Sequence, residues 1–272
     1  MALLEAVGIT VRFGGITAVD DASISADVGT VTGLIGPNGA GKTTLFNVIT
    51  GLQPPTRGRV RFRGHDVTKA TPNSRAKAGM GRTFQRLEAF GSLTVRENVL
   101  VAREIHLGVR GMFGRKQDTV VDELLERVGV TRYANQRADS VPTGTARLVE
   151  MARALAIEPR LLLLDEPSSG LDESETESFG HLLRSLSLDG TAILMVEHDM
   201  DLVMAVCDLI HVLEFGKVIA SGTPAQIRAD RKVQAAYLGF SDEPDPEPRH
   251  AAVDPVGAAE TTMELPVVEA DA

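Results

Sequence analysis

The sequence predicts an α/β fold with a mostly parallel sheet, an N-terminal antiparallel β-subdomain and a small helical subdomain. Residues 1–35 alternate short β-like runs with glycine-rich turns, which is typical of antiparallel strands. Residues 94–140 are rich in helix formers. Residues 145–214 alternate helical segments with short apolar runs, and this order indicates a parallel sheet covered on both faces.

In the first part of the chain, short strands are expected to lead into a glycine-rich loop and a helix. Gly51 follows the helical pattern, as a C-terminal glycine cap does. The expected elements are strands at Leu3–Val7, Ile9–Phe13, Ala22–Ala26 and Val31–Ile35, a helix at Lys42–Thr50, a loop at Gln53–Gly58 and a strand at Arg59–Arg63.

The rest of the chain supplies the helical subdomain and the second half of the α/β unit. Period and length distinguish its helices from its buried strands. The expected helices are Val95–Ile105, Thr119–Val128, Thr145–Ala156, Ser174–Leu186 and Met200–Val206, and the expected strands are Leu161–Leu164, Ala192–Val196 and Ile210–Glu214.

Charge is unevenly distributed, and this bears on domains and partners. Of the net charge of −9, residues 241–272 carry −8 and the other 240 residues carry −1. We expect one folded unit over 1–240, with the helical subdomain at 87–145, and a disordered acidic, proline-rich tail at 241–272. The body has no overall positive excess for a phosphate backbone, and aromatic residues make up only 4%. No nucleic-acid partner is therefore expected.

Cys207 is the single cysteine, so an intrachain disulfide is excluded and a buried apolar role is expected. A cytosolic setting fits this cysteine usage. The first residues lack the basic and apolar regions of a signal peptide. No apolar run approaches the roughly 20 residues of a membrane helix. If the protein works at a membrane, we expect another chain to hold it there.

The loop after the expected strand Val31–Ile35 has the pattern Gly, four residues, Gly-Lys-Thr, which indicates a phosphate-binding P-loop. Its glycines allow main-chain N–H groups to turn towards phosphate oxygens, and the following helix points its N-terminus at the same anion. We expect Lys42 to reach the β- and γ-phosphates and the Thr43 hydroxyl to bind Mg²⁺. The expected nucleotide-binding set is Gly36, Pro37, Asn38, Gly39, Ala40, Gly41, Lys42, Thr43 and Thr44.

Two carboxylates follow the apolar run Leu161–Leu164. Downstream of a P-loop, Asp165 is expected in the Mg²⁺ shell and Glu166 is expected to polarise the attacking water. The alternative is an ordinary acidic cluster at a helix N-terminus before Pro167.

Two more polar residues become candidates for the site only when they are considered together with the P-loop and the carboxylates. Gln85 can offer a neutral oxygen to the metal or the water, although a lone glutamine is usually a surface residue. His198 follows the expected strand Ala192–Val196 and can donate a hydrogen bond to charge on the γ-phosphate. The alternative for His198 is a satisfied histidine at a strand end.

In this order, Lys42, Gln85, Asp165, Glu166 and His198 make the chain resemble an ABC-type ATPase over residues 3–239. The stretch 168–172 then matches the family's D-loop. The resemblance implies head-to-tail pairs that enclose two ATP molecules between the P-loop of one subunit and the signature motif of the other. It also implies that Phe13 stacks on adenine, with a core phenylalanine as the alternative.

The signature motif departs from the family pattern Leu-Ser-Gly-Gly-Gln. The matching residues are Val141, Pro142, Thr143, Gly144 and Thr145, so only the second glycine remains. Proline cannot replace the serine hydroxyl that contacts the partner's γ-phosphate in the family. Helix amides after Gly144, or the hydroxyl of Thr143 or Thr145, are the expected substitutes. We hypothesise an asymmetric pair with a different ATPase subunit.

Further stretches resemble ATPase subunits of branched-chain amino acid importers, although lipopolysaccharide-export and urea-import ATPases share much of this pattern. The resemblance implies permease subunits, a second ATPase subunit, a solute-binding protein and a location on the cytoplasmic side of the membrane. Phe90 and Leu93 are candidate permease contacts or simple packing residues. The alternatives are an export ATPase, a soluble non-transport ABC ATPase and a regulatory module without hydrolysis. The stretches are 12–19, 81–85, 93–99, 197–200, 222–224 and 236–239.

Overall fold

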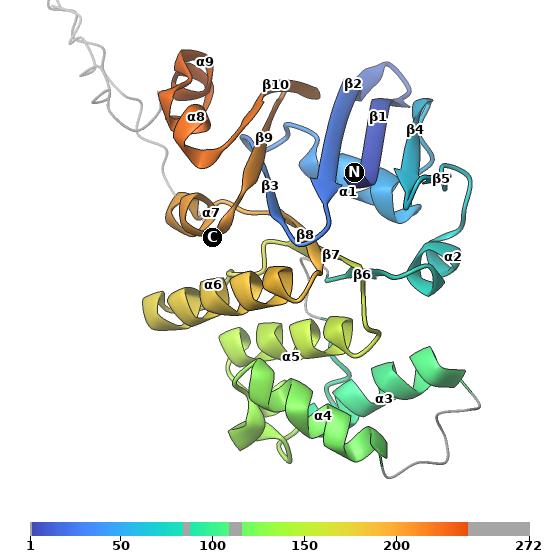
Figure 1. Ribbon diagram of the computed structural model, residues 1–272, viewed down its shortest axis with the longest axis vertical. Coiled ribbons are helices and arrows are strands. Elements are labelled where there is room, and N and C mark those ends of the chain that lie inside the picture. Colours follow the sequence, from blue (N-terminus) through green and yellow to red (C-terminus); the bar gives the residue numbers. More distant parts are fainter. Residues whose placement is uncertain (1, 84–87, 109–115, 239–272) are drawn as a thin grey trace, which may run out of the picture.

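The computed structural model describes residues 2–83, 88–108 and 116–238 and consists of two sheets and a layer of helices (Figure 1). The predicted tail at 241–272 and Gln85 lie outside the described residues. No helix in these described ranges is long and apolar enough to cross a membrane.

The first sheet is antiparallel, with strand order β2-β1-β4-β5. The two strands expected at 3–7 and 9–13 are in fact one strand, because an irregularity between Ala6 and Ile9, with Gly8 at φ 60°, bends the chain without ending its pairing. Likewise β4 begins inside the expected loop at 53–58. The strands are β1 Ala2–Phe13, β2 Ile16–Asp27, β4 Arg57–Phe62 and β5 His65–Asp66.

The second sheet confirms the predicted parallel core and has strand order β10-β9-β3-β8-β7-β6. Every residue of β3, β7 and β8 is buried, which explains their continuous apolar sequence. Only β10 pairs in the antiparallel sense. The strands are β3 Val31–Ile35, β6 Met80–Arg82, β7 Leu161–Asp165, β8 Ala192–Val196, β9 Leu209–Glu214 and β10 Lys217–Gly222.

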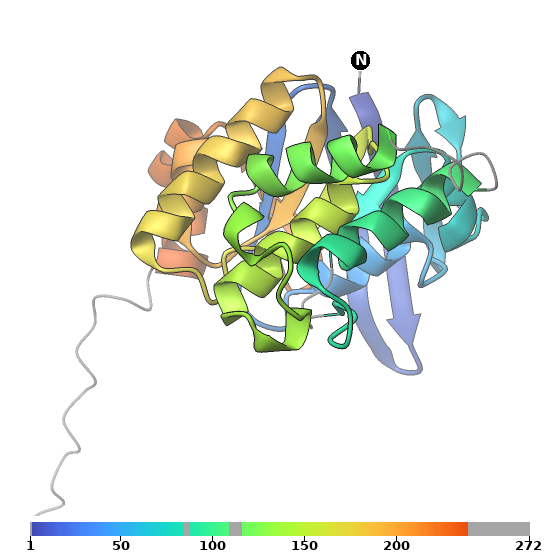
Figure 2. The same cartoon turned by 90° about the horizontal axis from the view of Figure 1, so that it is seen from below.

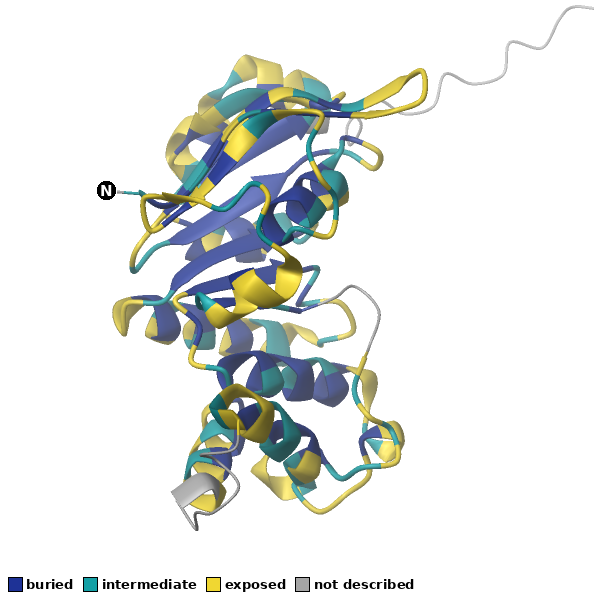
Figure 3. Cartoon of the chain, turned by 90° about the vertical axis from the view of Figure 1, so that its right-hand side faces the viewer, coloured by how far each residue is buried: buried dark blue, intermediate teal, exposed yellow. Residues whose placement is uncertain are grey.

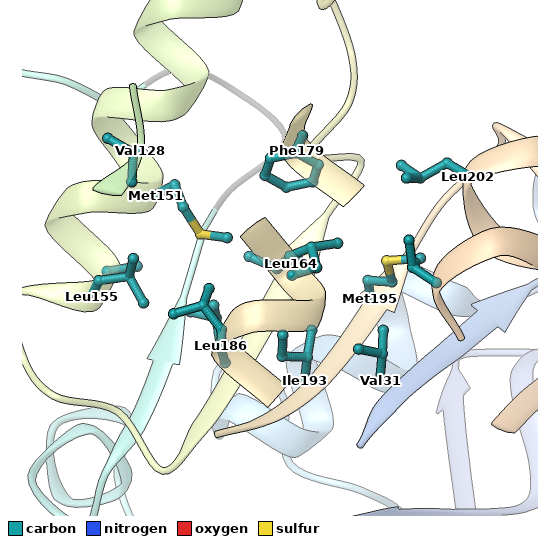
Figure 4. Packing of buried hydrophobic residues seen from close by; sticks show 14 of the residues in the cluster. Val31, Val128, Met151, Leu155, Leu164, Phe179, Leu186, Ile193, Met195 and Leu202 are labelled. Atoms are coloured by element: carbon teal, nitrogen blue, oxygen red, sulfur yellow. The ribbon is translucent and has the colours of Figure 1, made fainter. Parts of the chain in front are cut away.

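Two hydrophobic cores lie on opposite faces of this central sheet. Along β7, Leu161 and Leu163 face the first sheet and α1 (Lys42–Thr50), whereas Leu162 and Leu164 face the other helices. Figure 4 shows the second core, where Leu164 lies near Phe179 and Leu186. Colouring by burial shows the strands as the most buried layer (Figure 3). The sheet ends are thus held rigidly from both sides.

The helices expected from the sequence are confirmed, with shifts of a few residues at their ends. Seen from below, α3, α4, α5 and α6 lie in front of the central sheet (Figure 2). Thr94 and Glu97 form a capping box at the start of α3, and Asp172 and Glu175 form one at α6. These helices are α3 Val95–Leu107, α4 Lys116–Arg127, α5 Thr143–Leu155, α6 Glu173–Leu188 and α7 Met200–Val206.

Several short elements were not predicted, because runs of two to six residues carry little periodicity. Besides β5, β6 and β10, they comprise helices α2 Pro72–Lys77, α8 Pro224–Ala229 and α9 Arg231–Val233, the 3₁₀ turns Thr131–Tyr133 and Ala138–Ser140, and the π turn Gln234–Leu238. The predicted burial of Cys207 is confirmed at 3% exposure, and burial raises the pKa of its thiol to about 12.

Candidate nucleotide-binding site

The glycine-rich loop runs from the end of β3 into α1, and two of its glycines are required by close packing. Gly36 has φ 151°, and a Cβ there would lie 2.0 Å from the Leu213 carbonyl oxygen. Gly41 has φ 103°, and a Cβ would lie 2.4 Å from the Ala18 carbonyl oxygen. The loop is therefore fixed between β9 and the first sheet, and no larger residue fits at these two positions.

Lys42 is the first residue of α1 and is only 6% exposed. Its ammonium group donates to the carbonyl oxygens of Gly36 at 2.5 Å and Pro37 at 3.0 Å, so the loop curls around the charge. Burial lowers the pKa of Lys42, while the nearby carboxylates of Glu166 and Asp165 oppose this shift. The geometry places a cation within the glycine-rich loop at the start of α1, which suits a phosphate group.

Asp165 ends β7 and is 2% exposed. Its Oδ2 accepts a hydrogen bond from Nη2 of Arg82 at 3.2 Å. The other guanidinium nitrogen of Arg82, Nη1, donates to Asn47 at 2.8 Å and to the Thr50 hydroxyl at 3.0 Å, both on α1. Burial raises the pKa of Asp165, and the positive charge of Arg82 opposes this effect. Arg82 therefore links the carboxylate to the helix that begins at the glycine-rich loop.

Glu166 and His198 follow the neighbouring strands β7 and β8, whose parallel pairing brings their carboxyl ends together. His198 Nε2 lies 3.0 Å from Glu166 Oε1. Glu166 adopts φ 50°, an uncommon value for a residue with a side chain, and its N–H donates to the Val196 carbonyl oxygen at 2.9 Å. The pairing of β7 with β8 thus brings a carboxylate and an imidazole into contact at the edge of the sheet.

Of the predicted site residues, the described ones divide into two groups. The P-loop, Asp165, Glu166 and His198 meet at the carboxyl ends of β3, β7 and β8, where ligands bind in open α/β sheets. Phe13 lies at the end of β1 and is 49% exposed, so the core-packing alternative is wrong. Gln85 lies outside the described residues, and its role stays a prediction.

The second group is the signature stretch, which lies at the start of α5. This helix begins at Thr143, two residues earlier than predicted, and Pro142 supplies no side-chain cap to it. Gly144 packs so closely that a Cβ there would lie 2.9 Å from the Gly170 carbonyl oxygen. Thr143 is exposed, whereas Thr145 is only 3% exposed. Thr143 is therefore the more accessible of the two hydroxyls, and the role of Thr145 stays a prediction.

Sequence reasoning missed two polar residues that support the site. Arg82 was seen only as a neighbour of Gln85, and Glu197 only as a neighbour of His198. Both are nearly buried charged side chains, and each has a partner that lies tens of residues away in the sequence. A charged residue at the end of a strand could have been recognised in the sequence as a candidate for the site. Its partner is identified only by the tertiary structure.

The oxygen donors present fit a bound Mg²⁺. The exposed Thr43 hydroxyl follows Lys42, and the Asp165 carboxylate lies at the end of β7. Within the described ranges, no group of three or more His, Cys, Asp or Glu side chains is arranged to hold a metal by itself. One carboxylate and one hydroxyl suit an ion that takes its other ligands from phosphate and water, as Mg²⁺ does.

Comparisons with known proteins agree with this geometry. The family model described as "ABC transporter" matches residues 19–169, and one described as "Branched-chain amino acid ATP-binding cassette transporter" matches residues 217–239. The chain is 39% identical to the high-affinity branched-chain amino acid transport ATP-binding protein BraF of Pseudomonas aeruginosa, covering 87% of this chain and 98% of BraF. It is 32% identical to the lipopolysaccharide export system ATP-binding protein LptB of Haemophilus influenzae, covering 88% and 98%.

A solved ATP-binding cassette of an ABC transporter in its ADP conformation is also similar. It is 30% identical and has a TM-score of 0.79, and the alignment covers 88% of this chain and 99% of that one. The matches in sequence and structure extend over the same folded region that carries the P-loop and the carboxylates. The chain therefore belongs to the family of ATP-binding, ATP-hydrolysing subunits of ABC transporters.

Proposed function

We propose that this ATPase drives the import of branched-chain amino acids or related small solutes through partner permease subunits. The observation that carries the proposal is the 39% identity to BraF over nearly the whole of that protein. The separate match of residues 217–239 to the branched-chain family model supports it. The similarity to LptB is lower, at 32%, so lipopolysaccharide export is the second candidate.

In the proposed complex, the chain lies on the cytoplasmic side of the membrane and is held there by the permease. A second ATPase subunit completes its site, and a solute-binding protein delivers the solute. Phe90 is 47% exposed and packs against the Arg153 guanidinium, whose carbon lies 4.9 Å from the ring centroid. This half-exposed ring, together with Leu93, is our candidate contact for the permease.

The P-loop is proposed to hold the ATP phosphates. Lys42 exchanges its loop carbonyl partners for β- and γ-phosphate oxygens, and main-chain N–H groups from Gly36 to Thr44 surround the same anion. The exposed ring of Phe13 stacks on adenine. Thr43 and Asp165, with Gln85, would hold the magnesium ion, which neutralises phosphate charge when bound.

Hydrolysis is proposed to use the pair at the ends of β7 and β8. The Glu166 carboxylate accepts a proton from a water molecule and orients it for in-line attack on the γ-phosphorus. His198, which contacts Glu166 at 3.0 Å, donates a hydrogen bond to the charge that develops on the γ-phosphate oxygens. Lys42 stabilises the same charge from the opposite side of the phosphate group.

The pair with the second ATPase subunit is proposed to be asymmetric. This chain brings a full set of residues to its own site but offers Pro142 where the family has a serine hydroxyl. Thr143 is the exposed hydroxyl at the start of α5, and Gly144 with Thr145 supplies the first helix amides. The ATP bound to the partner subunit is therefore hydrolysed more slowly than the ATP bound here.

Transport by the reconstituted complex tests this proposal. The chain is purified with its permease and second ATPase subunits, placed in vesicles, and supplied with ATP and labelled leucine in parallel with a Lys42→Ala complex. We expect ATP-dependent leucine uptake in the wild type and none in the variant. Extraction of lipopolysaccharide without leucine uptake would instead establish the export candidate, and the absence of both activities would refute transport of either class.

A further inference from the structure

The first residue after β8, Glu197, is a buried carboxylate with three main-chain partners. It is 2% exposed. Its Oε1 accepts a hydrogen bond from the N–H of Ser168 at 2.8 Å. Its Oε2 accepts one from the N–H of His198 at 2.9 Å and a longer one from the N–H of Asp199 at 3.5 Å. The two oxygens of one side chain therefore hold two separate segments of the chain, one after β7 and one after β8.

The segment after β7 contains Glu166 and the turn that follows it. The Ser169 N–H donates to the Glu166 carbonyl oxygen at 3.2 Å, and the Leu171 N–H donates to the Ser168 carbonyl oxygen at 3.0 Å. The turn then reaches the start of α5, where a Cβ on Gly170 would lie 3.1 Å from the Thr143 side chain. The hydrogen bond from the Ser168 N–H to Glu197 therefore attaches this turn to the end of β8.

The segment after β8 contains His198, whose ring contacts Glu166 at 3.0 Å. A closed loop of contacts results: Glu197 holds the backbone of His198, His198 holds the Glu166 side chain, and Glu197 also holds Ser168. Contiguous contacts of this kind can couple the position of one segment to that of the other. The side chain of Glu197 itself is directed at main-chain N–H groups and does not contact the Glu166 side chain in these bonds.

The chemistry of the position requires an anionic acceptor of this length. A buried carboxylate is costly unless hydrogen bonds compensate it, and bonds from N–H groups to a carboxylate are stronger than neutral ones. A glutamine of the same size has only one acceptor oxygen, and its NH₂ group would face a main-chain N–H.

We propose that Glu197 is a positioning residue for ATP hydrolysis, which fixes His198 and the turn 168–172 relative to each other. It touches no substrate atom and acts mainly through His198, whose position relative to the turn it fixes. This inference rests on the roles proposed above for Glu166 and His198.

A double-mutant cycle tests it in the full chain assembled with its partner subunits. We expect Glu197→Gln to lower kcat by about 10- to 100-fold, because small misplacements of reacting groups have effects of this size. The KM for ATP should change less than about threefold, since the P-loop contacts are untouched. In a His198→Ala background, the same substitution should lower kcat by less than about threefold, because its main route of action is already lost.

Asp208→Asn is the matched control. Asp208 also accepts a main-chain N–H, from Val31 at 2.8 Å, but at the opposite end of the sheet. It should retain the wild-type kcat. A purely structural role for Glu197 predicts the same fold loss of kcat with and without His198, in parallel with a lower melting temperature, and this result would overturn the proposal. If Glu197→Gln does not fold, the cycle is run with Glu197→Asp under the same criteria.

Two failures remain distinguishable. If His198→Ala and Glu166→Gln both retain wild-type kcat, the proposed roles of those residues are wrong, and the role of Glu197 falls with them. If these variants lose activity but Glu197→Gln keeps at least half of the wild-type kcat, only the inference about Glu197 fails.

Discussion

Two regions of the molecule present the N-terminus of a helix. One is the glycine-rich loop before α1, the other is the start of α5, and they differ in the residues that surround the helix. At the P-loop, two glycines are locked by carbonyl oxygens of neighbouring elements, and a buried lysine fills the loop. At the start of α5, only Gly144 is locked in this way, against Gly170, and proline occupies the capping position.

This difference supports the proposed asymmetry, in which the first region performs hydrolysis and the second only partly assists the site of the partner subunit. The first region brings Lys42, Asp165, Glu166 and His198 together within one rigid sheet edge. The second packs against the turn after β7, and it has Pro142 where the family pattern has a serine hydroxyl.

The largest expected effect tests the hydrolytic region. We expect Glu166→Gln to lower kcat by at least about 100-fold, because the amide cannot accept the proton of the attacking water. Binding of an ATP analogue, measured by fluorescence, should change little because the P-loop is intact. Glu177→Gln, an exposed change on α6, is the control. Near wild-type turnover in Glu166→Gln would contradict the comparison outright.

A smaller effect is expected at the support of Asp165. Arg82 bonds to Asp165, Asn47 and Thr50 at once, and a lysine cannot match this planar fork. We expect Arg82→Lys to raise the Mg²⁺ concentration needed for analogue binding by about tenfold, as changes to groups that orient metal ligands do. Arg127→Lys, whose ion pair with Asp189 is exposed, should leave this concentration unchanged. If Arg82→Lys needs the same Mg²⁺ concentration as the wild type, the proposal that Asp165 binds the metal would be contradicted.

Introducing the family residues at the start of α5 tests the proposed asymmetry. We expect the double change Pro142→Ser and Thr143→Gly to raise ATP turnover of the assembled pair several-fold, because a hydroxyl returns to the partner's γ-phosphate. A hydrogen bond to a charged group contributes about 1.5–3 kcal/mol, which sets the upper limit of the gain. Turnover of this chain's own site, isolated with a hydrolysis-deficient partner, should not change. Equal hydrolysis at both sites of the unmodified pair would refute the asymmetry.

The smallest effect concerns the scaffold that both regions share. His211 on β9 bonds to Ser221 at 2.7 Å, and burial lowers its pKa. The unfolded chain therefore binds this proton more readily than the folded one. The stability contributed by neutral His211 is present above the unfolded pKa of about 6.5 and is lost as the pH falls below it. We expect a lower free energy of unfolding at pH 5.5 than at pH 7.5 in denaturant titrations, and a weaker dependence in His211→Gln.

Much of the fold was predictable because its central strands are continuous apolar runs. The strand at 192–196 and the helices at 42–50 and 200–206 agree with the sequence prediction residue for residue. The prediction failed where tertiary pairing overrides a local break, as at Gly8, or where short edge strands such as β6 and β10 have no periodicity of their own. At the start of α5, the sequence predicts two hydroxyls, and only packing shows that Thr143 is exposed while Thr145 is buried.

The P-loop, the carboxylate pair and the order of the motifs are evident from the sequence, because each depends on residue types at fixed spacing along one strand and turn. The distant charges that support them are evident only from the folded structure. Arg82 meets Asp165, and Glu197 joins Ser168 to His198, because parallel pairing brings the ends of β6, β7 and β8 side by side. A buried charge needs a partner, and here the partner lies on a neighbouring strand. The separation of two residues along the sequence does not show whether their strands are neighbours in the sheet.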